Sequence, residues 1–112
     1  MTRKVVRAKA EEAVATEEIV LPKSFEIGGI TVAVVEDPHL YESHGCFGMM
    51  DLDNGKLFID SGLVGDVRGI TFLHEKIHMV LNTLGKTELN EDEAFVDGVA
   101  NLLWQAIKTE KY

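Results

Sequence analysis

Two histidines, His74 and His78, stand four residues apart, and Glu75 directly follows the first of them. On an α-helix this spacing places both imidazoles on one face, where they can bind the same ion. Zinc accepts neutral imidazole nitrogen readily, and the pattern H-E-x-x-H is typical of metallohydrolases. Glu75 would project about 100° around the helix from His74, beside the ion. There it can take a proton from a zinc-bound water, so we expect Glu75 to be the catalytic base and one Zn²⁺ to be the cofactor.

A third protein ligand is needed, because a catalytic zinc ion usually has three and leaves its fourth position to water. Glu93 shares a predicted helical face with Val96, so it is expected to point inward and to bind the ion. Glu91 and Asp92 remain open as alternative ligands. A capping role for Glu93 is also open, because it stands three residues after Asn90, the capping-box spacing.

Other polar residues could support the metal centre. Asp97, one turn after Glu93, would accept a hydrogen bond from a ligand histidine and fix its tautomer. In the loop before the second hairpin, Tyr41 and His44 are candidates to stabilise an oxyanion, and His39 is a weaker one. Surface positions in that loop are the alternative for all three. Cys46 could bind zinc as a thiolate, although a small, buried, apolar role is favoured.

The first half of the chain is rich in β-forming residues with turn signals between them. Gly28-Gly29 and Asn54-Gly55 each separate two short strand-like runs, as in β-hairpins. One antiparallel sheet of three or four strands is therefore expected. The predicted strands cover residues 24–27, 30–35, 46–52 and 56–60.

The second half is helical, with apolar residues at intervals of three and four. The first helix is predicted over 66–84, with Gly85 as its C-cap, and the second over about 90–108. Trp104 is expected to pack in the core. Strands followed by helices predict an α+β domain whose sheet packs on the H-E-x-x-H helix and on a C-terminal helix. The apolar positions predicted to be buried are Ile70, Leu73, Ile77, Val80, Leu81 and Leu84 in the first helix and Val96, Ala100, Leu103 and Ile107 in the second.

The length and the net charge of the chain argue against some classes of function. The 112 residues suffice for one domain, expected over 18–112, preceded by a flexible or helical arm over 1–17. A net charge of −8 argues against nucleic-acid binding and against docking on an anionic membrane. One cysteine cannot form an internal disulfide, and the N-terminal charges do not fit a signal peptide, so a cytoplasmic location is expected.

The segment 71–78, Thr-Phe-Leu-His-Glu-Lys-Ile-His, followed by Glu93 and Asp97, resembles the gluzincins, and its phrasing is similar to the ImmA/IrrE-like metallopeptidases of phages, mobile elements and bacteria. The resemblance covers about residues 24–107. It implies a small zincin-like fold, with His74, His78 and Glu93 as ligands and Glu75 as general base. The Glu-Ala-Asn phrase common in that family reads Glu-Ala-Phe here.

The sequence therefore predicts a zinc metalloendopeptidase. Its partner would be a protein or peptide substrate, and the resemblance suggests a transcriptional repressor. The alternative is a non-catalytic accessory protein of the same fold, for example of a phage, with a structural metal or none. A fourth ligand such as Cys46, His39 or His44 would favour that alternative. The oligomeric state is left open.

Overall fold

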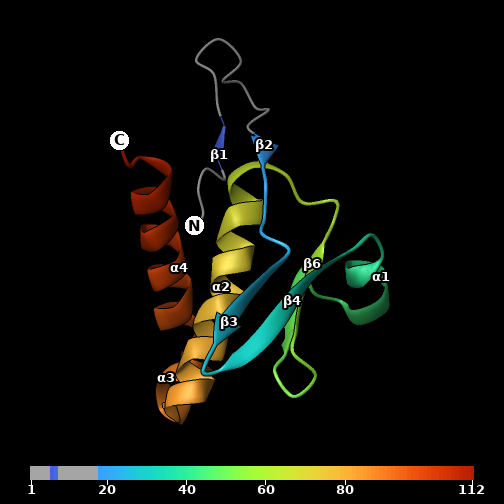
Figure 1. Cartoon of the computed structure of the whole chain (residues 1–112), viewed down its shortest axis with the longest axis vertical. Coiled ribbons are helices and arrows are strands. Elements are labelled where there is room, and N and C mark those ends of the chain that lie inside the picture. Colours follow the sequence, from blue (N-terminus) through green and yellow to red (C-terminus); the bar gives the residue numbers. More distant parts are fainter. Residues whose placement is uncertain (1–5, 8–17) are drawn as a thin grey trace.

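The computed structural model describes residues 6–7 and 18–112. The described elements follow one another as strands first and helices second, with one short helix between strands (Figure 1). In chain order they are β1 (Val6–Arg7), β2 (Glu18–Ile19), β3 (Ser24–Ile27), β4 (Ile30–Asp37), α1 (Leu40–His44), β5 (Gly48–Asp51), β6 (Lys56–Asp60), α2 (Gly65–Leu84), α3 (Thr87–Glu91) and α4 (Glu93–Lys108).

The main sheet has four strands in the order β3-β4-β6-β5. Both predicted hairpins are confirmed, since β3 pairs antiparallel with β4 and β5 pairs antiparallel with β6. The prediction of a wholly antiparallel sheet is wrong, because β4 and β6 run parallel. After β4 the chain passes through α1 and returns along β5, so β6 has the direction of β4. The fold is therefore α+β with a mixed sheet.

The turn between β3 and β4 needs its two glycines. Gly28 and Gly29 have φ angles of 57° and 81°, a left-handed conformation that side chains rarely adopt. Two such residues in succession form the turn whose twist matches a two-residue hairpin. Here the local sequence is sufficient to predict the structure.

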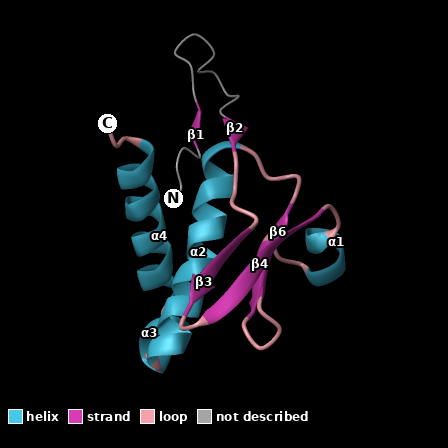
Figure 2. Cartoon of the chain, viewed as in Figure 1, coloured by secondary structure: helices cyan, strands magenta, loops and turns pink. Residues whose placement is uncertain are grey.

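Helix α2 lies against the sheet on one side and against α4 on the other (Figure 2). The side toward the sheet buries Phe72 and Met79, which the predicted apolar stripe did not include. Val80 and Leu84 of that stripe are 41% and 64% exposed, so they do not belong to the core. The buried residues of the core cluster are Ile19, Leu21, Val32, Leu57, Ile59, Phe72, Leu73, Met79, Ala100 and Trp104.

Contact between α2 and α4 depends on a glycine facing a tryptophan. A Cβ atom on Gly69 would lie 2.5 Å from the ring of Trp104, so only glycine lets the indole pack directly on α2. The indole N–H of Trp104 donates a hydrogen bond to Asp66 at 3.0 Å. The packing role predicted for Trp104 is confirmed. Leu103, expected in the same row, is 42% exposed.

The predicted arm over residues 1–17 falls outside the described residues except for Val6–Arg7, which pair with Glu18–Ile19. Within the part of the chain that the structure describes, no helix has both the length and the apolar character needed to cross a membrane.

Candidate metal centre

Three side chains converge between the middle of α2 and the start of α4. The Nε2 atoms of His74 and His78 lie 3.2 Å apart. Glu93 places one carboxylate oxygen 3.3 Å from Nε2 of His74 and the other 3.5 Å from Nε2 of His78. Among the described residues, these three form the group of potential ligands whose atoms all lie within 4.8 Å of one another.

These spacings are those of ligands around a small tetrahedral ion. Zinc bonds of about 2.0–2.1 Å at tetrahedral angles place neighbouring ligand atoms roughly 3.3 Å apart. The three observed separations of 3.2, 3.3 and 3.5 Å fall around that value. The group can therefore hold a metal ion without a large rearrangement, and its two nitrogens and one carboxylate suit zinc.

The remaining ring nitrogens are occupied by two different partners. Nδ1 of His74 lies 2.8 Å from a carboxylate oxygen of Asp97. Nδ1 of His78 lies 2.6 Å from the side-chain oxygen of Asn90. The contact predicted between Asp97 and a ligand histidine is present. The contact of Asn90 was missed, because no spacing rule links an asparagine on a separate short helix to this histidine.

Glu75 lies beside the cluster, under strand β5. A Cβ atom on Gly48 of β5 would lie 2.8 Å from Thr71 and 3.0 Å from Cγ of Glu75. The strand and the helix can therefore lie this close together because residue 48 is a glycine. Burial raises the pKa of Glu75 above its usual value of 4.5, and the nearby Glu93 adds to this, while His74 and His78 act in the opposite direction. A raised pKa makes this carboxylate a better proton acceptor than an exposed glutamate.

Glu93 and Asp97 line the side of the site that faces solvent. Their side chains are 62% and 61% exposed, whereas those of His74 and His78 are 20% and 15% exposed. The expectation that Glu93 points into the interior is therefore wrong in part, since it contacts both histidines from the solvent side. Water can reach the cluster from this direction.

The capping alternative for Glu93 does not hold. The structure begins α4 at Glu93, with Asp92 as the N-cap whose side chain accepts a hydrogen bond from the backbone N–H of Phe95 at 3.1 Å. Asn90 belongs to α3 instead of capping α4. Asp92 is thus engaged in capping, and Glu91 is not in the group of converging ligands.

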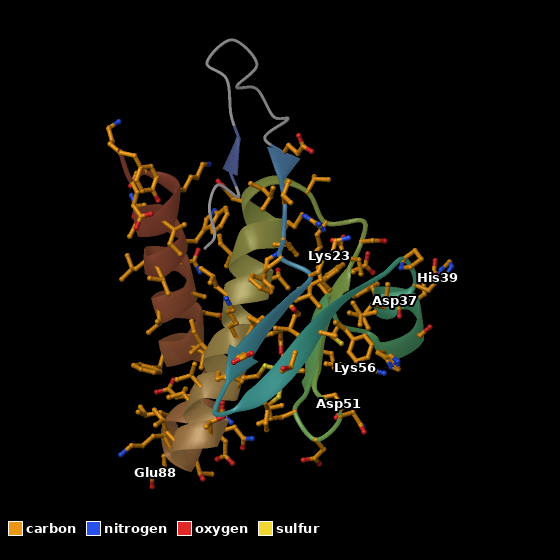
Figure 3. All side chains as sticks on the ribbon, viewed as in Figure 1. Lys23, Asp37, His39, Asp51, Lys56 and Glu88 are labelled. Atoms are coloured by element: carbon orange, nitrogen blue, oxygen red, sulfur yellow. The ribbon has the colours of Figure 1, made fainter. Side chains whose placement is uncertain are left out.

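The loop residues considered for an oxyanion site lie on and beside α1. Tyr41 stacks on Phe47 with ring centroids 4.4 Å apart, and His44 is exposed at the end of the helix. The role of Tyr41 and His44 as oxyanion stabilisers stays a prediction. Figure 3 shows His39 and Glu88 of α3 on opposite sides of the molecule, so His39 lies far from the α3–α4 junction.

Cys46 is half-buried just before β5. Burial, together with the nearby Glu75, raises the pKa of its thiol above the usual 9.0. A thiol with a raised pKa is a poor metal ligand and a poor nucleophile at neutral pH. Neither Cys46, His39 nor His44 joins the converging group, so that group has three members within the described residues.

Comparison of the chain with protein-family models, with curated proteins and with solved structures found no significant match. The resemblance to ImmA/IrrE-like metallopeptidases therefore rests on the sequence motif and its spacing.

Proposed function

We propose that this chain is a zinc-dependent peptidase with a zincin-like fold. The observation that carries the proposal is the convergence of three ligand atoms at zinc spacing, while the Nδ1 atoms of both histidines are engaged elsewhere. His74, His78 and Glu93 would hold the ion. When bound, zinc would polarise the scissile carbonyl and acidify the attacking water.

Glu75 is the general base of the proposed reaction. It stands next to His74 in the sequence and beside the cluster in space, and burial raises the pKa of its carboxyl. It would take a proton from the attacking water and pass it to the nitrogen of the leaving amine. Water and substrate would approach the cluster from its exposed side, which is formed by Glu93.

Strand β5 supports a peptide as the substrate. It is an edge strand of the main sheet. The backbone N–H of Asp60 donates a hydrogen bond to the carbonyl of Phe47 at 2.9 Å, and this bond determines which residues of β5 pair with β6 by hydrogen bonds. Hydrogen bonding in an antiparallel pair alternates along the strand, so the backbone groups of Gly48 and Met50 face the free edge. An extended peptide pairing there would lie against Glu75.

The alternative is a non-catalytic accessory protein with a structural metal. Structural zinc sites are closed by a fourth protein ligand. The converging group has three members among the described residues, and Cys46 is not one of them. Three ligands without a fourth, within the part of the chain that the structure describes, favour catalysis over a structural metal.

The test is the substitution Glu75→Gln, which keeps the size of the side chain and removes its basicity. Zinc content should stay at the wild-type level, while peptide hydrolysis falls by about 10²–10⁴-fold, the usual contribution of a general base. Zinc-loaded protein is incubated with a library of unstructured peptides, and mass spectrometry counts the new amino termini. Glu88→Gln, on α3, is the control and should keep full activity.

Wild-type activity in Glu75→Gln would remove Glu75 from the mechanism. Zinc binding by the wild-type chain without hydrolysis of any peptide in the library would favour the accessory protein.

A further inference from the structure

The junction between α3 and α4 contacts both ring nitrogens of His78. The side-chain oxygen of Asn90 lies 2.6 Å from Nδ1, and an oxygen of Glu93 lies 3.5 Å from Nε2. The two nitrogens of an imidazole face different directions, so these side chains approach the ring from different sides. The pattern H-E-x-x-H specifies neither this arrangement nor the partner of the second histidine.

A break in the helix makes the arrangement feasible. Helix α3 ends at Glu91, and Asp92 has an extended backbone with φ −89° and ψ 92°. Helix α4 then begins at Glu93 in a new direction, and Figure 1 shows α3 at the lower end of α2 and α4 running beside it. The change of direction places Asn90 and Glu93, three residues apart, on two sides of one imidazole.

The chemistry of the two groups determines which atom donates the hydrogen bond between His78 and Asn90. The oxygen of an asparagine side chain only accepts hydrogen bonds, so Nδ1 of His78 must carry the hydrogen. A neutral imidazole has one N–H, so Nε2 then keeps its lone pair. That lone pair points at the converging group formed with His74 and Glu93. In the other tautomer, a hydrogen on Nε2 would occupy the position of the ion.

We propose that Asn90 is a positioning residue, which holds the ring of His78 in the tautomer that binds the metal. The inference rests on the proposed metal centre and deepens it. Asn90 does for His78 what Asp97 does for His74 at 2.8 Å, but it brings no charge. A neutral partner at this position avoids a third carboxylate beside Glu93 and Asp97.

The experiment measures the affinity of the full chain for Zn²⁺ alone, by competition with a chromophoric chelator. Asn90→Leu keeps the approximate size of the side chain and removes the acceptor, so affinity should fall by about 10–100-fold, as for other partners of metal-bound histidines. Asn90→Asp retains an acceptor oxygen and should stay within a few-fold of wild type. Rescue by aspartate but not by leucine distinguishes an acceptor from a residue that only fills space.

Two further variants complete the set. Asn90→Ala should show the same loss as the leucine variant and serves if leucine prevents α3 from folding. Asn82→Ala is the matched control, because Asn82 is exposed on α2 one turn after His78. This control should bind Zn²⁺ like the wild type.

A second readout is independent of the metal. ¹⁵N NMR of the metal-free chain, recorded at alkaline pH so that a neutral ring is observed, should show His78 with its hydrogen on Nδ1 in the wild type and in Asn90→Asp, and a mixture of tautomers in Asn90→Leu. Wild-type zinc affinity in Asn90→Leu, or an unchanged tautomer, would overturn the inference. Absence of zinc binding by the wild type would instead overturn the proposed function, while the NMR result would still decide the role of Asn90.

Discussion

In each histidine of the cluster, the two ring nitrogens contact different groups. Nδ1 is held by Asp97 or Asn90, and Nε2 faces the other ligands. Because both rings are already oriented, little reorganisation is needed to bind an ion. This division also explains why the histidines tolerate partial burial, since each ring nitrogen has a polar neighbour.

Gly48 sets the distance between the edge strand and the proposed general base. Gly48→Ala would place a methyl group 2.8 Å from Cγ2 of Thr71 and 3.0 Å from Cγ of Glu75. Either β5 or Glu75 must then move, and displacements of about 1 Å at a reacting group cost roughly 100-fold in rate. We expect peptide hydrolysis to fall by about 10–100-fold with zinc content unchanged, measured by the peptide assay and by metal analysis.

Thr71→Ser provides the matched control for this prediction. It deletes Cγ2, the atom closest to the new methyl group. Alone it should be nearly neutral, and combined with Gly48→Ala it should restore part of the lost activity. Wild-type activity in Gly48→Ala, or a double variant no better than the single one, would show that the close approach is unimportant.

At the residue level, helical spacing, which is a local property, predicted His74 with His78 and Glu93 with Asp97, and the need for a third zinc ligand together with the family resemblance joined the two pairs. The structure brings these four together. The contacts of Asn90 with His78 and of Gly48 with Glu75 were not predicted, because neither a spacing rule nor a ligand requirement links these residues. Amphipathic periodicity also placed Glu93 inside, although the helix break at Asp92 leaves it 62% exposed.

Among the elements, α1 is attached to the end of β6 by one carboxylate. Asp60 is 9% exposed and accepts hydrogen bonds from the backbone N–H groups of Tyr41 at 3.0 Å and Gly62 at 2.8 Å. The bond from Tyr41, followed by that from Gly62, lowers the pKa of Asp60 below its usual 3.8. Because the folded pKa lies below the unfolded one, the stabilisation is present above pH 3.8 and is lost as the pH falls through the folded value.

Asp60→Asn should therefore destabilise the protein at pH 7, and the difference from wild type should shrink as the pH falls below 3.8. The amide would keep one acceptor and turn its NH₂ group toward an N–H donor. Urea unfolding at several pH values measures this, with the exposed Asp53→Asn as control. A difference that is constant over the whole pH range would contradict the assignment.

The elements differ in how far local sequence determines them. The hairpin at Gly28-Gly29 and the helix end at Gly85 follow from residues within the turn or cap, and both were predicted. The parallel pairing of β4 with β6 was not, because it depends on how two hairpins join through α1. The burial of Phe72 and Met79 likewise depends on α2 being covered on two sides.

In the whole molecule, the proposed ion would add a link between α2 and α4, which already meet through packing and through polar contacts such as the hydrogen bond from Trp104 to Asp66. His74 and His78 lie on α2, and Glu93 begins α4, whose main contact with α2 includes Gly69 and Trp104. An ion bound only by the folded chain stabilises it by mass action, about 4 kcal/mol at 1,000 times the dissociation constant. Zinc should therefore raise the melting temperature, and a chelator should reverse the effect.

Metal content of the purified chain is the most direct test of the account. We predict one zinc ion per wild-type chain, measured by elemental mass spectrometry after dialysis, and a loss of that ion in both His74→Ala and Glu93→Ala. Glu88→Ala on α3 should retain it. A wild-type chain without zinc after incubation with the ion, or undiminished zinc in His74→Ala and Glu93→Ala, would contradict the metal centre.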